Sequence, residues 1–258
     1  DYDRGVHRIF TVAPTVITGV QSRHQTAYTY RAGIVYSPFG AHQFYFNTAT
    51  SFSPVTTVPA NQAELQPQHG LTYEVGHRWK GWRGRLSTNL ALYSIERDGQ
   101  TIVTSQTTVA QVGSLKSKGV DFDANADLGW GTHLLVNYGY AQAYYDDPGG
   151  SLNTRIPRFV PKHTANAWLR KQWASGFSAS IGTRYVGPQF ANNNNTRSIG
   201  GYNVLSGAVG YRARTWEWTV NADNLLNRGR YFLPAQLDNV VFPGQPITVS
   251  TSFRWRFD

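Results

Sequence analysis

The 258-residue sequence contains neither cysteine nor methionine, and only 15% of its residues are charged. The absence of cysteine excludes a disulfide framework and any thiolate metal site. Long hydrophobic runs are also missing: stretches such as Ala32–Tyr36 fall far short of the roughly 18 consecutive apolar residues that a transmembrane helix needs. A helical membrane protein is therefore excluded. A membrane β-barrel is not, because its strands need apolar residues only at alternate positions.

The sequence begins at Asp1, without an initiator methionine or a signal peptide, so we interpret it as a mature or excised segment. Its formal net charge of +9 allows a nucleic-acid-binding surface as one interpretation. The basic residues, however, occur singly through alternating segments and do not form a patch. We therefore expect them in a polar lumen or on a rim that faces lipopolysaccharide, and we expect no nucleic-acid partner.

Apolar and polar side chains alternate along nearly the whole chain, as they do in a β-strand with two different faces. Near the C-terminus, for example, Phe253, Trp255 and Phe257 alternate with Arg254 and Arg256. The predicted strands, two of them less regular (162–173 and 202–211), are 28–36, 43–51, 72–80, 86–92, 121–128, 133–140, 162–173, 177–185, 202–211, 216–223 and 247–257. This pattern predicts roughly eleven strands of about ten residues, the length with which a tilted strand crosses a bilayer.

Short and long connections alternate between these strands. The short ones are tight turns such as 81–84 and 129–131, and the long polar ones are 53–70, 98–112, 145–160, 188–200 and 227–245. Such alternation is typical of outer-membrane barrels, which have short periplasmic turns and long extracellular loops. Tryptophans gather in or near the short turns, where an interfacial aromatic girdle is expected; they are Trp79, Trp82, Trp130, Trp173, Trp216 and Trp255.

We therefore predict an all-β fold, an antiparallel transmembrane β-barrel of the outer membrane. An open sheet in lipid would leave unpaired backbone groups that each cost several kcal/mol, and bacterial barrels have even strand numbers. Either Val6–Val12 supplies a further strand, or the barrel closes with strands upstream of Asp1. We prefer the second, with Asp1–Gln25 as the tail of an earlier strand and a surface loop.

Several short motifs, in order along the chain, resemble the C-terminal half of TonB-dependent siderophore receptors of the ferrichrome and ferric-pyoverdine type. The similarity covers about Tyr28 to Phe257. The segments that carry it are Thr29–Tyr36 with Ser51–Pro54, Leu65–Gly70 with Tyr73–Gly76, Ser117–Asp121, Val220–Arg228 with Tyr231-Phe232, and the tail Val249–Phe257. Gln68 and Asp121 replace the acidic residue and the glutamate that are usual at these positions.

The resemblance implies a receptor that imports ferric siderophores through a barrel of about 22 strands. This chain, residues 1–258, would be the C-terminal portion of that barrel, with the plug domain absent from it. The implied partners are the ferric siderophore, the TonB–ExbB–ExbD complex acting through the plug, outer-membrane lipid with lipopolysaccharide, and the barrel-assembly machinery. That machinery would read the terminal aromatics Phe253, Trp255 and Phe257; Asp258, which follows them, departs from the pattern.

Binding of a siderophore at the outer face needs an aromatic and polar cup that the long loops can reach. The candidate ligand-binding residues are Tyr144, Tyr145, Phe190, Asn192 and its neighbours through Asn195, Tyr231, Phe232 and Gln236. Loop aromatics can equally pack the loops themselves, and asparagine-rich tips are often turns. Four arginines on the predicted polar face could contact plug carboxylates, attract an anionic chelate, or simply form a solvated wall: Arg31, Arg184, Arg254 and Arg256.

Other functions remain open on the same sequence. The cargo could be haem, cobalamin or an oligosaccharide, and more remote alternatives are a passive porin or an outer-membrane enzyme. We expect no enzyme, because Asp146-Asp147 is the nearest suggestion of a catalytic group and reads as a solvated loop tip. We expect no protein metal site or cofactor, because the seven histidines lack metal-ligand spacing and the iron would arrive already chelated. His77 is expected on the outward face near the girdle.

Overall fold

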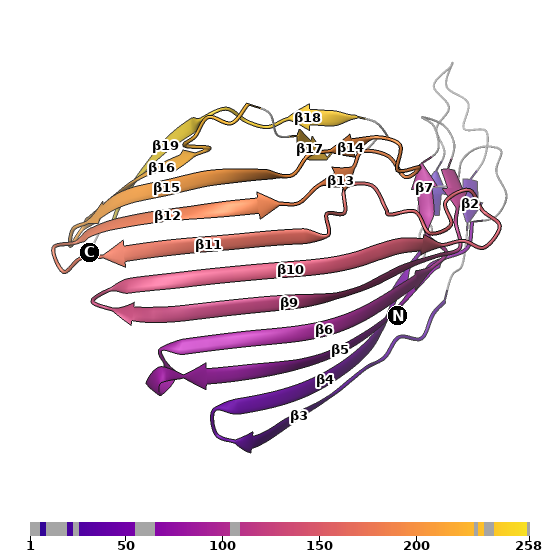
Figure 1. The fold of residues 1–258 in the computed structure, drawn as a ribbon, viewed down its shortest axis with the longest axis horizontal. Coiled ribbons are helices and arrows are strands. Elements are labelled where there is room, and N and C mark those ends of the chain that lie inside the picture. The colour runs from indigo at the N-terminus through magenta and orange to yellow at the C-terminus, as the bar shows by residue number, and fades with distance from the viewer. Residues whose placement is uncertain are drawn as a thin grey trace.

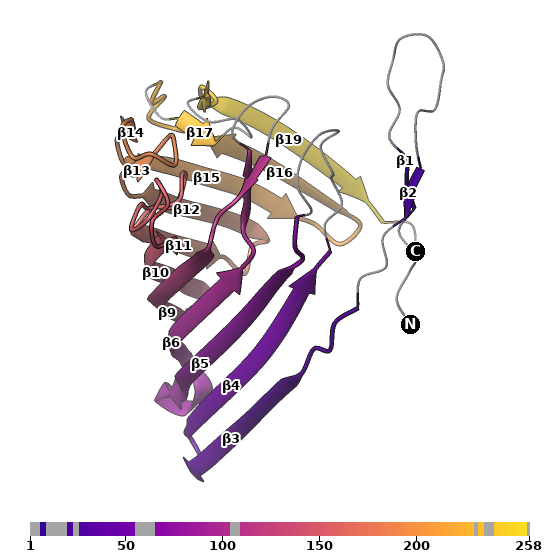
Figure 2. The same ribbon diagram turned by 90° about the vertical axis from the view of Figure 1, so that its right-hand side faces the viewer.

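A computed structural model shows one curved antiparallel sheet of eleven strands, with smaller hairpins at one end (Figure 1). The structure describes residues 6–8, 20–22, 26–54, 65–103, 109–229, 232–234 and 240–256. Viewed from its right-hand side, the sheet follows an arc from β3 (Arg31–Phe39) to β19 (Thr248–Trp255) and encloses a wide concavity (Figure 2).

The large sheet has the strand order β19-β16-β15-β12-β11-β10-β9-β6-β5-β4-β3. Its remaining strands are β4 (His42–Ser53), β5 (Gln68–Gly81), β6 (Leu86–Asp98), β9 (Ser114–Gly129), β10 (Thr132–Asp146), β11 (His163–Gln172), β12 (Phe177–Val186), β15 (Tyr202–Arg212) and β16 (Trp216–Asp223). Every pairing between these strands is antiparallel, and each strand pairs with the next sheet strand along the chain. The prediction of roughly eleven antiparallel strands is confirmed.

Short and long connections alternate strictly, as predicted. The turns at one end are 40–41, 82–85 with the 3-10 helix η1 (Trp82–Gly84), 130–131, 173–176 and 213–215. Among the described residues, three of the five long connections at the other end contain paired hairpin strands: β7 (Thr101–Val103) with β8 (Val109–Gln111), β13 (Gln189–Phe190) with β14 (Ser198–Ile199), and β17 (Phe232–Pro234) with β18 (Val241–Pro243). All six tryptophans assigned to the girdle lie at the short-turn end. Trp255, at the end of β19, lies there opposite Trp216.

Strands β5, β6, β9 and β10 are longer than the sequence predicted, mainly toward the long loops. Strand β9 has 16 residues, and its first part, from Ser114, pairs with both β6 and β10. The predicted strand began only at Asp121, because alternation is weak in the segment before it. Backbone hydrogen bonds between strands continue past the part of each strand that faces the bilayer. Outside the bilayer, residues need not alternate between apolar and polar, so the sequence pattern does not predict this part of the strand.

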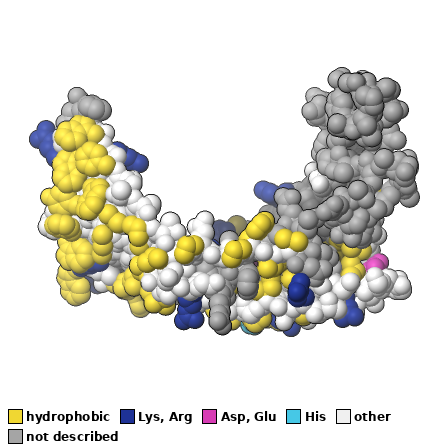
Figure 3. Space-filling model, turned by 90° about the horizontal axis from the view of Figure 1, so that it is seen from above, with side chains coloured by type: hydrophobic (Ala, Val, Ile, Leu, Met, Phe, Trp, Pro, Cys, Tyr) yellow, Lys and Arg dark blue, Asp and Glu magenta, His cyan; other side chains and the backbone are white. Residues whose placement is uncertain are grey.

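The two faces of the sheet separate by polarity. Directly opposed residues share one face, so the register joins Phe46, Val75 and Leu92 on one side and Gln43, Arg78 and Asn89 on the other. The apolar side is the convex one and is widely exposed, at 50% for Val75 and 63% for Val249. A space-filling view shows hydrophobic side chains gathered over the wall on the left (Figure 3). An apolar belt of this extent is the surface that acyl chains cover.

Buried residues are few and lie mainly at the long-loop end, where Val112, Tyr145 and Leu152 form a small hydrophobic cluster. Among the described residues, no helix has the length and apolar character required to span a bilayer.

The N-terminal segment does not extend the large sheet among the described residues. Strand β1 (Val6–Arg8) pairs with β2 (Val20–Ser22) in a separate two-stranded sheet, and neither belongs to the large sheet. Of the alternative barrel strand Val6–Val12, the structure describes only Val6–Arg8, which does not join the large sheet. The preferred alternative, closure by strands upstream of Asp1, stays a prediction. A hairpin satisfies the backbone groups of both strands locally, and alternation in sequence alone does not specify the pairing partner. In the described structure, both β3 and β19 are edge strands.

Candidate functional site

The concave face carries a continuous polar row across seven neighbouring strands. The register places these residues directly opposite one another: Gln43, Arg78, Asn89, Asp123, Asn137, Asn166 and Arg184. Every second residue of each strand points to this face, so a polar period of two on each strand produces a polar band across the sheet. The band supplies amide donors and acceptors together with ions of both signs to whatever lies within the curve.

Hydrogen bonds connect the centre of this row. Asn137 donates from Nδ2 to Asp123 Oδ1 over 2.6 Å, and Asn89 donates from Nδ2 to Asp123 Oδ2 over 3.5 Å. The hydroxyl of Tyr45 in turn donates to Asn89 Oδ1 over 3.2 Å, and the Arg78 guanidinium lies 4.5 Å from the centre of the Tyr45 ring. The chain of contacts fixes the orientation of these side chains, so this part of the wall is pre-organised for polar contacts.

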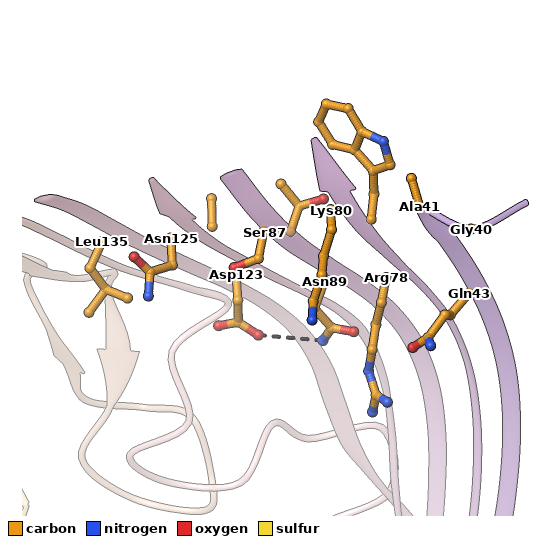
Figure 4. Close-up of a pocket in the computed structure, with 13 residues that line it drawn as sticks. Gly40, Ala41, Gln43, Arg78, Lys80, Ser87, Asn89, Asp123, Asn125 and Leu135 are labelled. Carbon is orange, nitrogen blue, oxygen red and sulfur yellow. Dashed lines mark hydrogen bonds between the residues drawn. The ribbon is translucent and has the colours of Figure 1, made fainter. Parts of the chain in front are cut away.

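Two cavities open on the concave face. A cavity of about 320 Å³ lies toward the short turns, and Gln43, Arg78, Lys80 and Asn125 are among its lining residues (Figure 4). In Figure 4 the bond between Asn89 and Asp123 crosses the same wall. A second cavity of about 390 Å³ is lined by polar groups and one indole: Asn166, Trp168, Arg184, Ser206 and Asp223 are among them.

Glycine lets large aromatic rings lie flat on this wall. A Cβ atom at Gly76 would come within 2.2 Å of the Tyr45 ring, and a Cβ at Gly182 would come within 2.2 Å of the Trp168 ring. Gly76 lies directly opposite Tyr45, and Gly182 directly opposite Trp168. Because glycine has no side chain, the aromatic ring from the neighbouring strand can lie flat over it. A flat ring projects less into the concavity than an upright ring would.

At the long-loop end, asparagines join two separate loops. Asn193 Oδ1 accepts hydrogen bonds from the Tyr145 hydroxyl and from the Arg158 backbone N–H, both at 3.0 Å. Asn195 exchanges two bonds of 2.7 Å with the backbone of Ile156, accepting from its N–H and donating to its carbonyl. We call this connection between loops 147–162 and 187–201 the asparagine clamp. It holds the rim of the concavity in one arrangement.

Two of the candidate ligand residues are buried at the asparagine clamp. Tyr145 is 4% exposed and Asn192 is 6% exposed, and both lie within this loop packing. Asn192 Oδ1 accepts from the Thr196 backbone N–H at 3.0 Å. A direct contact of either residue with a ligand would require the loops to rearrange, so the structure favours the alternative that these residues pack the loops.

Tyr144 and Phe190 occupy more open positions. Tyr144 lines a cavity of about 290 Å³ between the end of β10 and the following loop, together with Thr154, Ile156 and Lys162. Phe190 lies in β13, is partly buried, and accepts a backbone hydrogen bond of 2.8 Å from Phe159. Their contact with a ligand stays a prediction.

The remaining candidates lie at the margin of the described structure. Tyr231 and Gln236 are outside the described residues, and Phe232 is placed only as a backbone position of β17. The four predicted arginines do not form one group. Arg31 lies on the edge strand β3 and Arg184 lines the larger cavity, whereas Arg254 and Arg256 lie at the short-turn end near Glu217, which is 3.6 Å from Arg256.

The terminal aromatics lie on the convex face. Phe253 is 61% exposed and stacks on Trp216 with a centroid distance of 5.8 Å, and Trp255 is 51% exposed. Phe257 lies outside the described residues. Their role as an assembly signal stays a prediction.

Two basic residues were not predicted as functional from the sequence: Arg78 and Lys80, which line the cavity of about 320 Å³. Arg78 and Lys80 alternate with His77 and Trp79 in the sequence, so the period of two contained the signal. What it lacked was the register that brings them beside Asn89 and Asp123. His77 lies on the convex side as expected, stacked on Phe44 with a centroid distance of 4.7 Å. Among the described residues, no group of three or more metal-ligating side chains gathers.

Comparison with known proteins agrees with this architecture. The family model described as TonB dependent receptor-like, β-barrel matches residues 2–225. The ferrichrome outer membrane transporter/phage receptor of Escherichia coli K12 is 26% identical over an alignment of 196 residues that covers 73% of this chain and 26% of that protein. The ferrioxamine B receptor of Salmonella typhimurium is 23% identical over an alignment of 237 residues that covers 88% of this chain and 34% of that protein.

Solved structures show the same fold. The siderophore receptor PiuA from Acinetobacter baumannii superposes with a TM-score of 0.74 at 22% identity, covering 88% of this chain and 36% of that chain. The ferric-catecholate import receptor Fiu from E. coli, in its closed form, gives 0.73 at 20% identity, covering 92% and 36%. This chain spans about a quarter to a third of the length of these relatives. It belongs to the TonB-dependent receptor-like β-barrel family, whose barrels lie in the outer membrane.

Proposed function

We propose that the protein containing this chain is an outer-membrane receptor that binds ferric siderophores and imports them with energy supplied through TonB. The observation that carries this proposal is the family match over residues 2–225, together with relatives named for ferrichrome and ferrioxamine. The polar concave wall and the joined loops are compatible with it, because a large polar chelate needs a wide polar passage and a structured rim.

The chain contributes part of the barrel in this proposal. Strands β3 and β19 are both edges of the described sheet, and in lipid each unpaired backbone group costs several kcal/mol. We therefore propose that residues 1–258 form the C-terminal portion of a barrel of about 22 strands, closed by strands from elsewhere in the protein. A separate plug within that barrel would connect it to TonB, ExbB and ExbD.

In this proposal, residues at the long-loop end contact the siderophore. The siderophore itself holds the iron, and no protein metal site is involved. Tyr144, near the end of β10, and Phe190, in β13, are the described aromatic residues that we assign to the contact. Replacing each by alanine in the full-length receptor should weaken siderophore binding without changing the amount of assembled barrel. Ser151, which is exposed in the loop that follows β10 and is not among the candidates, provides an alanine control.

Uptake of radioactive iron by iron-starved cells tests the function. Cells carrying the full-length gene, cells deleted for it, and cells lacking functional TonB are offered ferric hydroxamates, ferric catecholates and haem. The proposal expects uptake of one siderophore to be lost in both the deletion and the TonB-deficient strain. If haem uptake alone is lost, or if every iron source is taken up normally, the siderophore proposal is wrong. Cobalamin and oligosaccharides are then the cargoes to offer.

A further inference from the structure

Three neighbouring turns at the short-turn end expose tryptophans beside basic side chains. These are the turns between β5 and β6, between β9 and β10, and between β11 and β12, which lie next to one another along the sheet (Figure 1). Trp130 is 92% exposed, Trp82 is 63% exposed and Trp173 is 45% exposed. A soluble surface seldom presents three indoles so openly in one place, so this edge has the character of an interface.

The backbone of these turns presents the indoles outward. Trp82 and Trp130 have φ angles of 51° and 50°, in the left-handed region that bulky side chains rarely adopt. Trp130 stands between two glycines with positive φ, Gly129 and Gly131, so the turn is tight and its central side chain has no neighbour on the chain to pack against. The strained conformation at both positions has the same result, an indole projecting beyond the end of the strands.

Two cations flank the Trp130 turn. Lys171 Nζ donates a hydrogen bond to the Trp130 carbonyl and lies 6.0 Å from the centre of the Trp173 ring. On the other side, the Arg85 guanidinium reaches Gly129, where a Cβ atom would come within 2.6 Å of its Nη2 atom. Arg85 has a carboxylate partner only at 3.8 Å, Asp127, and its side chain remains 48% exposed.

The direction of Lys171 follows from the register. Leu169, two residues earlier on β11, lies opposite Leu134 and Ile181 on the convex side, and Leu169 and Ile181 are 42% and 48% exposed. Lys171 has the same parity on its strand, so it too points to the convex side. Its ammonium group therefore lies just beyond the apolar belt, at the depth where lysines meet lipid headgroups.

We propose that Trp130, Trp173, Lys171 and Arg85 form a binding site for the phosphate headgroup of an anionic phospholipid in the leaflet that faces the short turns. The two indoles insert at the level of the ester groups, and the two cations contact the phosphate diester between them. Arg83, exposed in the adjoining turn, adds a third cation, while Asp127 is the one acid among the described residues that pairs with this group. The excess of positive charge selects an anionic over a zwitterionic headgroup. This site is independent of the cargo that the receptor transports.

Native mass spectrometry of the full-length receptor, released from nanodiscs, tests the site. Retained phosphatidylglycerol is compared with retained phosphatidylcholine, for the wild type and for the double variant Arg85→Gln/Lys171→Met. Each basic side chain near an anionic lipid contributes about fivefold in affinity, so the double variant should bind phosphatidylglycerol roughly 25-fold more weakly. Its retention of phosphatidylcholine should not change. A matched control removes two cations at the long-loop end, Arg155→Gln/Lys162→Met, and should retain phosphatidylglycerol like the wild type.

Assembly of each variant is checked by its heat-modifiable mobility in gel electrophoresis. If the double variant does not assemble, two other variants provide the test. The charge-conserving variant Arg85→Lys/Lys171→Arg should bind phosphatidylglycerol like the wild type. The single variant Lys171→Met should bind it about fivefold more weakly. Equal retention of both lipids by the wild type, or an equal loss in the long-loop control, would overturn the proposal. Either result would leave the turns as a purely aromatic anchor without a headgroup site.

Discussion

Replacing Asn193 by alanine should separate the two loops that the asparagine clamp joins. Asn193 is 5% exposed, and its one carbonyl oxygen serves two donors, the Tyr145 hydroxyl and the Arg158 N–H, both at 3.0 Å. A buried donor left without an acceptor costs about 1–3 kcal/mol. Taking the lower end for each of the two, the closed arrangement loses about 2 kcal/mol, which raises the population of the open arrangement roughly 30-fold.

The assay is limited trypsin digestion of the receptor in outer membranes, because both loops contain arginines, among them Arg155, Arg158 and Arg197. When opening is fast relative to cleavage, the cleavage rate follows the open population, so it should rise by the same roughly 30-fold. Hydrogen exchange separates direct from indirect effects: the Arg158 amide loses its acceptor, whereas the Ile156 amide keeps its bond to Asn195. Faster exchange at Ile156 therefore reports loop opening.

Asn194 offers the control, because it is exposed and adjacent in the same run of four asparagines. Asn194→Ala should leave trypsin cleavage and the exchange of Ile156 at their wild-type rates. The reasoning is refuted if the two alanine variants behave alike, or if Asn193→Ala accelerates exchange only at Arg158. In the second case the loops would be held together by other contacts, and the hydrogen bonds of Asn193 would be local.

Further predictions concern strand packing, a loop ion pair and assembly. Gly119→Ala should lower the yield of heat-modifiable barrel, because the added Cβ would lie 2.1 Å from a backbone carbonyl oxygen of the next strand. Such overpacking costs about 1–3 kcal/mol. Gly40→Ala should assemble normally, because nothing lies within 4 Å of its added Cβ. Lys116 binds one carboxylate on each neighbouring strand. Lys116→Met should therefore speed proteolysis of the loop end at low salt, and a difference that persists unchanged in 1 M salt (a Debye length of about 3 Å) would contradict an electrostatic cause. Phe253→Ala should slow barrel assembly several-fold in pulse-labelled cells, whereas Leu226→Ala, an exposed loop change, should not; equal rates would exclude Phe253 from the assembly signal.

The sequence by itself determined the number of strands and the polarity of each face. The reason is physical: a strand with lipid on one side and a polar lumen on the other must alternate. The alternation of short turns with long loops, and the position of tryptophans such as Trp130 at the short-turn end, could likewise be read from spacing alone.

Only the tertiary structure decided which side chains meet. Tyr145 and Asn193 are separated by 48 residues in the sequence, and nothing local distinguishes Asn193 from its exposed neighbour Asn194. The row that brings Arg78 beside Asn89 depends on register, and a shift of one residue would turn every side chain to the other face. The N-terminal hairpin shows the same limit, because alternation predicts a strand without naming its partner. A periodic pattern records the environment of each face, whereas contacts between distant segments arise only when the chain is folded.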